Sequence, residues 1–332
     1  ADFSTPLPLS YRFLRGRAEF WVSVAPREQL LRAYEQQDRT LYSQVLPLSH
    51  EQALELATRL YRDARPENRF YTYHHFTDNC TTRVRDHIDA VTHGKLAGGA
   101  ETLYPQPMRA LVREGFSTHL ALAIVGELAL ARTVDRRPTL WQAMFLPRVL
   151  REQIQARLGA EPHVLYQRRA RLGRGNVNIG GDVLLAAAAA WAVLLALGLR
   201  FGGRVGARVV LVMAGLLLGT VGVVLDALAA TSVHADLRQN EALLLFLPLD
   251  WLLALLGERW LCRYATLRLV WVTAVAALAA AGVLIEPLWP ALVFVGVTML
   301  IVAGLSRPAR AERAAWRMPS TGKVWGPPPR DV

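Results

Sequence analysis

The sequence predicts a two-part protein of α+β class, in which a mainly helical domain is followed by an all-α bundle of about five transmembrane helices. Residues 1–175 are mixed and rich in charge, as in a water-soluble domain, whereas residues 182–305 consist of long apolar runs with few charges. A chain of 332 residues is long enough for two domains. We therefore expect domains at 1–175 and 176–306 and a basic tail at 307–332.

Five apolar runs are candidates for membrane-spanning helices, each of which needs roughly 20 apolar residues. They are Val183–Leu199, Val209–Ala230, Ala242–Leu256, Leu269–Ile285 and Leu288–Leu305. The third run is short and is interrupted by Asp250, so its boundaries are the least well defined.

Charges between the apolar runs predict the orientation in the membrane. Arginines gather in the segments on one side, and the positive-inside rule places such segments in the cytoplasm. They are Arg200, Arg204, Arg208, Arg259, Arg263, Arg268, Arg307, Arg310, Arg313 and Arg317. The N-terminal domain is then extracytoplasmic and the C-terminus cytoplasmic, as in a bacterial inner-membrane protein. Because these segments hold much of the net charge of +11, we expect no nucleic-acid partner.

Helical spacing dominates the N-terminal half. Apolar residues recur at helical spacing in Arg27–Val45. Ser49 followed by Gln52 is a capping-box pattern that predicts a helix at about His50–Ala64. Phe70–Phe76 is short and aromatic, which is typical of a strand or an extended lead-in.

The segment after this aromatic run contains the main candidate for chemistry, Cys80. Asp78 and Asn79 are both good N-cap residues, and the apolar spacing that follows predicts a helix that ends near Gly94. In the first turn of that helix, free backbone N–H groups and the helix dipole would favour a Cys80 thiolate. Arg83, one turn further on, would add a positive charge on the same face.

Cysteine usage leaves two interpretations of Cys80 open. The predicted topology puts Cys80 outside and Cys262 on the cytoplasmic side, so the two do not form a disulfide within one chain. Cys80 is then either a reactive thiol or a buried structural residue. A nucleophile also needs a base, yet His87 would lie roughly 10 Å away along the helix. His74 and His75 are more typical of polar residues in a half-exposed strand.

Several segments spread over most of the chain point to one family. They are Asp2-Phe3-Ser4, Tyr11–Arg17, Asp78–Asp86, Asp135-Arg136, Trp141–Pro147, and His234 to Asn240 running into Leu244–Leu249. Together they resemble the Lnb-type bacterial lipoprotein N-acyltransferases, and DNCTTRVRD at Asp78–Asp86 is the most specific part. That family is similar to the circularly permuted papain-like (NlpC/LRAT-like) enzymes, among them the lecithin–retinol acyltransferase group.

The resemblance implies a permuted papain-like fold in which Cys80 is the nucleophile. Its motif neighbours would be Asp78, Asn79, Arg83, Arg85 and Asp86. The resemblance also implies a histidine base on an early strand. On this expectation the base lies upstream of residue 1, and the N-terminal part of the domain is missing from the sequence.

The implied reaction is a two-step acyl transfer without a cofactor or metal. A membrane phospholipid would donate an acyl chain to Cys80, and the α-amine of a diacylglyceryl-cysteine lipoprotein would accept it from the thioester. Tentative substrate-binding residues are His234, Asn240, Asp226 and Asp250, which would line a groove through which lipids enter. The alternative for the two aspartates is hydrogen bonding between helices or misplaced helix ends.

Three functions remain open at this point. The first is the lipoprotein N-acyltransferase, which a shielded, membrane-facing Cys80 would favour. The second is a membrane-tethered cysteine hydrolase, either a peptidase or a phospholipase, which an open and water-filled cleft would favour. The third is a non-catalytic assembly or binding module, in which the Cys80 sulfur would pack among apolar side chains.

Overall fold

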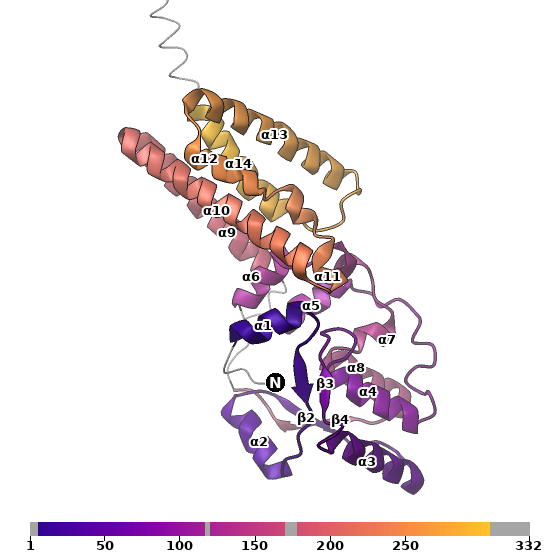
Figure 1. Ribbon diagram of the computed structural model, residues 1–332. Coiled ribbons are helices and arrows are strands. Elements are labelled where there is room, and N and C mark those ends of the chain that lie inside the picture. The colour runs from indigo at the N-terminus through magenta and orange to yellow at the C-terminus, as the bar shows by residue number, and fades with distance from the viewer. Residues whose placement is uncertain (1–5, 117–119, 170–177, 306–332) are drawn as a thin grey trace, which may run out of the picture.

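A computed structural model describes residues 6–116, 120–169 and 178–305 of the chain (Figure 1). In this part an N-terminal half of helices and short strands lies against one end of a bundle of apolar helices. The Asp2-Phe3-Ser4 stretch, the predicted domain boundary at 175/176 and the predicted tail at 307–332 lie outside the described residues.

The N-terminal half is mostly helical. Its helices are α1 (Pro6–Leu14), α2 (Arg27–Gln36), α3 (His50–Ala64), α4 (Cys80–Val91), α5 (Met108–Phe116), α6 (Leu120–Ala129), the 3-10 helix η1 (Arg132–Asp135), α7 (Leu140–Ala143) and α8 (Pro147–Leu158). Ile88 of α4, Leu111 of α5 and Val149 of α8 are buried together in one apolar core. This core fixes α4, and therefore the position of Cys80.

Two small antiparallel sheets accompany these helices. Strand β1 (Glu19–Trp21) pairs with β3 (Phe70–Thr72), and β2 (Leu41–Gln44) pairs with β4 (Pro162–Tyr166). The predicted strand at the start of the aromatic run is therefore confirmed over Phe70–Thr72. The papain-like arrangement of the whole domain stays a prediction.

Of the two helices predicted before the aromatic run, one is confirmed and the other is confirmed only in part. Helix α3 begins as expected, because Ser49 and Gln52 form the complete capping box. The helix expected over Arg27–Val45 ends at Gln36. Asp38 then adopts a left-handed conformation, with φ of 48°, and the chain enters β2. Pairing with β4, which is more than 100 residues away, outweighs the local helical spacing.

The C-terminal part contains four long apolar helices, α9 (Ile179–Phe201), α10 (Gly203–Thr231), α13 (Glu258–Ala280) and α14 (Trp289–Leu305). Among the described residues, three stretches are long and apolar enough to cross a membrane, namely Ile179–Gly198, Val205–Thr231 and Trp260–Ala280. Helix α14 is apolar but shorter. The coarse prediction of a helical membrane bundle is thus confirmed, whereas a bundle of five transmembrane helices is not.

The prediction that the third apolar run, Ala242–Leu256, forms a membrane-spanning helix is wrong. Ala242–Leu256 is divided among two 3-10 turns, η2 (Glu241–Leu244) and η3 (Pro248–Trp251), and the short helix α12 (Leu252–Leu255). We call Glu241–Leu256 the broken segment. Pro248 accounts for one interruption, since proline cannot donate the backbone hydrogen bond that a continuous helix needs there.

The broken segment runs antiparallel to α10 and close against it. The Arg208 guanidinium, near the start of α10, donates to the carbonyls of Ala254 and Leu256. Gly219 and Gly222 make the close approach possible. A Cβ at Gly219 would lie 2.2 Å from the Trp251 ring, and one at Gly222 would lie 2.7 Å from the Leu247 backbone. Non-helical backbone at membrane depth is tolerated where protein covers it in this way.

The fourth span begins earlier than expected. Helix α13 starts at Glu258 rather than near Leu269, so Cys262 and Arg268 lie within it. Arg268 therefore does not belong to a flanking basic segment. Arg268 is buried and forms an ion pair with Asp250 of the broken segment. This pairing compensates the cost of placing the Arg268 charge inside the apolar bundle.

Backbone hydrogen bonds join the N-terminal half to the segment after the C-terminal end of α10 and to the short helix α11 (Ala235–Arg238). The Val233 amide donates to the Leu14 carbonyl at 3.0 Å, and the Ala131 amide donates to the Asp236 carbonyl at 2.7 Å. The His74 and His234 rings also meet, with centroids 4.9 Å apart. The loop that precedes Cys80 is thereby held next to the bundle.

Candidate functional site

A tight loop positions the start of α4. The His74 amide donates to the Asp78 carbonyl at 2.9 Å, and the Asp78 amide donates to the His74 carbonyl at 3.1 Å. These two bonds turn the chain from β3 toward the helix. Cys80 follows as the first residue of α4.

Asn79, rather than Asp78, is the N-cap of α4. Its side-chain oxygen accepts hydrogen bonds from the amides of Thr81 and Thr82, at 2.8 and 2.9 Å. Its side-chain amide donates to the carbonyls of His75 and Phe145. Asn79 is buried, and it holds the helix start while leaving the Cys80 side chain free. The predicted place of Cys80 in the first turn is confirmed.

The Cys80 thiol is exposed. Among the described residues its one hydrogen-bond contact is the Thr81 hydroxyl, 4.0 Å from the sulfur. Burial, followed by the nearby Cys80 thiolate, raises the pKa of Tyr73 to about 12. The same two causes also raise the pKa of Tyr71. These two tyrosines, which no sequence motif marked, therefore lie close enough to the thiol for its charge to affect their pKa values.

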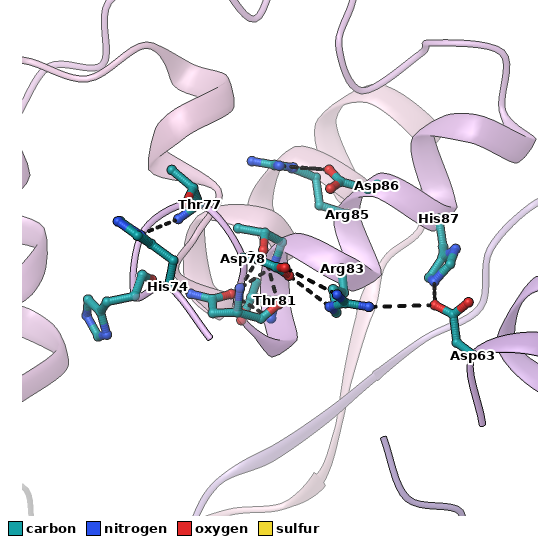
Figure 2. A network of polar contacts seen from close by, with 12 residues as sticks. Asp63, His74, Thr77, Asp78, Thr81, Arg83, Arg85, Asp86 and His87 are labelled. Atoms are coloured by element: carbon teal, nitrogen blue, oxygen red, sulfur yellow. Dashed lines mark hydrogen bonds and ion pairs between the residues drawn. The ribbon is translucent and has the colours of Figure 1, made fainter. Parts of the chain in front are cut away.

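Arg83 is less available to Cys80 than predicted, because two carboxylates share its charge. It forms a two-pronged ion pair with Asp78, at 2.8 and 3.2 Å, and approaches Asp63 at 3.9 Å. Asp63 in turn contacts the His87 Nε2 atom at 2.9 Å. Figure 2 shows this chain of contacts running from Asp78 through Arg83 to His87. No motif marked Asp63, which comes from α3.

Arg85 and Asp86 face a different side of α4 (Figure 2). The buried Arg85 guanidinium donates to the Trp141 carbonyl at 2.9 Å, lies 3.9 Å from the centre of the Trp141 ring and pairs with Asp86. These contacts attach α4 to α7. They give the two residues a packing role away from the thiol.

Two histidines precede the helix and are held as neutral imidazoles. Burial, followed by neighbouring His74, lowers the pKa of His75 to about 4, and its Nδ1 atom lies 3.2 Å from the Tyr73 hydroxyl. Burial, followed by nearby His234, also lowers the pKa of His74. The His74 Nδ1 atom accepts from the amides of Phe76 and Thr77. Within the described ranges, neither ring reaches hydrogen-bond distance of the Cys80 sulfur.

The four tentative substrate-binding residues occupy different surroundings. His234 is buried, stacks on the Phe13 ring and donates from Nε2 to the Phe13 carbonyl at 2.6 Å. Asn240 caps the start of the broken segment. Asp226 is exposed on α10, whereas Asp250 is fully buried. The structure brings His234 to the loop before Cys80, and the groove through which lipids would enter stays a prediction.

A polar cavity of about 330 Å³ opens beside this loop, where the N-terminal half meets the bundle. Among its lining residues are His74, Thr77, Thr133, Arg136, Arg137 and Asp236. We call it the junction cavity. The sequence marked Arg136 only as part of a family-like dipeptide and gave no signal for Arg137.

An apolar cavity of about 320 Å³ lies within the bundle. It is lined by α6, α9, α10, α14 and the broken segment, through residues such as Leu128, Leu184, Trp191, Val221, Phe246 and Phe294. We call it the bundle cavity. Its size is within the range of small-ligand pockets. Within the described part of the chain, no group of three or more metal-binding side chains gathers at either cavity.

These features define a membrane protein whose N-terminal domain presents an exposed thiol at a helix start, next to the bundle. Residues 3–114 match the family model described as the Lnb N-terminal periplasmic domain. Residues 3–114 therefore form an Lnb N-terminal periplasmic domain, and the family assignment made from the sequence is confirmed over this part of the chain. Neither the curated proteins nor the solved structures give a match.

Proposed function

We propose that the protein is a lipoprotein N-acyltransferase in which Cys80 carries the acyl group. The observation that supports this most is the place of Cys80 at a capped helix start, in a periplasmic domain of the Lnb family next to apolar helices. The thiol itself is exposed. The third hypothesis, a structural Cys80 packed among apolar side chains, is disfavoured by this exposure.

In the first step, the Cys80 sulfur attacks the ester carbonyl of a phospholipid. A carbon–sulfur bond forms and the ester carbon–oxygen bond breaks, so that a lysophospholipid leaves and its oxygen takes a proton. In the second step, the α-amine of a diacylglyceryl-cysteine lipoprotein attacks the thioester. The amide forms, the nitrogen loses a proton and the Cys80 thiolate leaves, which is favourable because a thiolate is a better leaving group than an amine.

The surroundings of Cys80 suit lipid substrates. His74 and His234 connect the Cys80 loop to the outer end of α10, which would hold the thiol close to the bilayer surface. The bundle cavity would accept an acyl chain. In this proposal the protein lies in the bacterial inner membrane, with residues 1–175 extracytoplasmic, a bundle at 176–306 and a cytoplasmic tail.

The test is mass spectrometry of the purified full-length protein after incubation with phospholipid. We expect a fatty-acyl adduct on Cys80 that is absent from Cys80→Ser. Adding a diacylglyceryl peptide with a free α-amine should discharge the adduct and yield the N-acylated peptide. A full-length protein that never forms the adduct would contradict the proposal.

The exposure of Cys80 favours a second candidate, a membrane-tethered cysteine hydrolase, because water can reach the thiol. Such an enzyme would release free fatty acid from the thioester, or would cleave peptides. The acyltransferase predicts instead that the amine acceptor speeds the loss of the adduct and that the peptide gains the acyl chain. The ratio of N-acylated peptide to free fatty acid therefore separates the two functions.

A further inference from the structure

The junction cavity lies at the level where the N-terminal half meets the outer end of the bundle. Its lining includes residues of α5, η1 and α11, and both helices contact η1. Thr133 of η1 donates to the Asp236 carboxylate at 3.0 Å, which joins two of its walls. If the apolar helices span a bilayer, this level is that of the lipid headgroups.

Cationic groups dominate the charge of the junction cavity. Arg136 is exposed, and its guanidinium forms no ion pair or hydrogen bond with the described residues. The Arg137 Nε atom donates to the Tyr104 carbonyl at 2.9 Å, which holds that side chain while its terminal nitrogens make no bond within the same ranges. Asp236 is the one carboxylate in the lining, and it already accepts from Thr133.

His74 extends the cavity toward the nucleophile. It lines the cavity and begins the tight loop that ends in Asn79 and Cys80. Its Nδ1 atom accepts from two loop amides, so the Nε2 atom carries the proton and can donate. The cavity therefore has two guanidinium groups and a neutral imidazole donor at the near end of the loop that presents the thiol.

We propose that the junction cavity binds the phosphate of the donor phospholipid, with Arg136 and Arg137 as its main donors. Guanidinium groups match the planar, two-pronged geometry that phosphate oxygens accept, and they keep their charge at all physiological pH values. A phosphate held there would leave the glycerol esters on the side of the Cys80 loop. This inference rests on the proposed function, because it assigns a place to the donor of that reaction.

Binding to the unreactive full-length Cys80→Ala protein tests the inference separately from catalysis. Native mass spectrometry in detergent would compare a phosphatidylethanolamine with a diacylglycerol that has the same acyl chains and no phosphate. With Arg136→Gln and Arg137→Gln combined, we expect the affinity for the phospholipid to fall about ten- to hundredfold, as for the loss of charge-assisted hydrogen bonds. The affinity for diacylglycerol should stay within about twofold of its original value.

One control variant and two further variants of Arg136 complete the test. Arg27→Gln with Arg32→Gln removes the same charge from the exposed surface of α2 and should leave both affinities unchanged. Arg136→Gln alone, at an exposed position, avoids the Arg137 contact with Tyr104 and should still weaken phospholipid binding, and Arg136→Lys should restore part of it.

Several results would overturn the inference. An equal loss of affinity for both lipids, or no loss for either, would show that the two arginines do not bind the phosphate. Weaker binding of a diacylglyceryl peptide with unchanged phospholipid binding would assign the cavity to the acceptor. Inorganic phosphate binding as tightly as the phospholipid would indicate a free-anion site. By contrast, a wild-type protein that binds phospholipid as expected but forms no Cys80 adduct would contradict the proposed function and not the binding inference.

Discussion

Asn79 before Cys80 and Asn240 before the broken segment make the same kinds of contact. Each side-chain oxygen accepts from backbone amides of the turn that follows, and each side-chain amide donates to a distant carbonyl, of Phe145 and Leu128 respectively. Each segment also contains an aspartate held by both prongs of an arginine. The local chemistry of the two regions is therefore alike.

The surroundings of the two ion pairs differ. The side chains of Arg83 and Asp78 are 30% and 39% exposed, whereas those of Arg268 and Asp250 are 5% and 0% exposed. Water competes for the first pair and screens it, so it contributes little to stability. The second pair has no such alternative partner, so the loss of either member leaves a buried charge. The Asp78–Arg83 pair therefore contributes mainly to the charge near the Cys80 thiol. The Asp250–Arg268 pair instead stabilises the irregular backbone of the broken segment.

The largest expected effect comes from breaking the buried pair. Arg268→Leu leaves Asp250 with only the Tyr264 hydroxyl, which donates to it at 2.7 Å, and also removes the bond to the Leu245 carbonyl. We expect the free energy of unfolding to fall by about 3–5 kcal/mol, as for other buried pairs that lose one partner. Denaturation of the full-length protein in detergent measures this loss.

A double variant separates the charge from the packing. Asp250→Leu combined with Arg268→Leu removes both charges and should recover much of the lost stability. Arg263→Leu, an exposed arginine of the same helix, is the matched control and should cost less than about 1 kcal/mol. A single variant at Arg268 as mild as this control would show that the pair does not hold the broken segment.

A smaller effect on stability, of opposite sign, is expected from replacing Glu286. Its side chain accepts a hydrogen bond from the first backbone amide of the broken segment. Its carboxylate accepts from the Glu241 amide at 2.8 Å, and burial raises the pKa of Glu286 to about 7. Because the folded protein holds this proton more tightly than the unfolded chain does, stability is greatest below the ordinary pKa and falls as pH rises to about 7. Glu286→Gln keeps an acceptor and removes the charge.

This substitution should raise the free energy of unfolding by about 1–3 kcal/mol at pH 8 and flatten its dependence on pH between about 5 and 8. Unfolding of both proteins across that range provides the measurement. Glu51→Gln, at an exposed position on α3, should change neither quantity. An unchanged slope for Glu286→Gln would mean that the carboxyl is charged throughout.

The two regions also differ in how well the sequence predicts them. Asn79, Cys80 and Thr82 lie within four residues, so the helix start and the place of the thiol follow from local rules. In the broken segment, apolar composition predicted a helix, but Pro248 and the contacts with Gly219 decide the outcome. Those contacts join residues far apart in the sequence. For the same reason Asp63 was missed beside Arg83, since it comes from α3, 20 residues earlier in the sequence.

The smallest effect on stability is expected from breaking the exposed pair, Asp78 and Arg83. The separate effects of its two members can be measured through the reactivity of the Cys80 thiol. Asp78→Asn and Arg83→Gln both break the pair, and Arg83→Gln also removes the approach to Asp63 and the contact with the Tyr71 ring. Because these side chains are partly exposed, each variant should cost less than about 1 kcal/mol. Their effects on the alkylation rate of Cys80 should be opposite. Losing the Asp78 charge should speed alkylation by roughly two- to tenfold, because thiolates react faster where nearby charge is more positive, and losing the Arg83 charge should slow it.

Alkylation of the folded full-length protein with a neutral reagent at pH 7 measures both rates. Arg85→Gln is unsuitable as a control, because it also breaks the contact with Trp141. Glu51→Gln, on the exposed surface of α3, should leave the rate unchanged. If both variants of the pair slow alkylation, the pair acts by positioning the start of α4 rather than by its charge. Its role would then be the same as that of Asp250 and Arg268, and exposure would no longer distinguish the two regions.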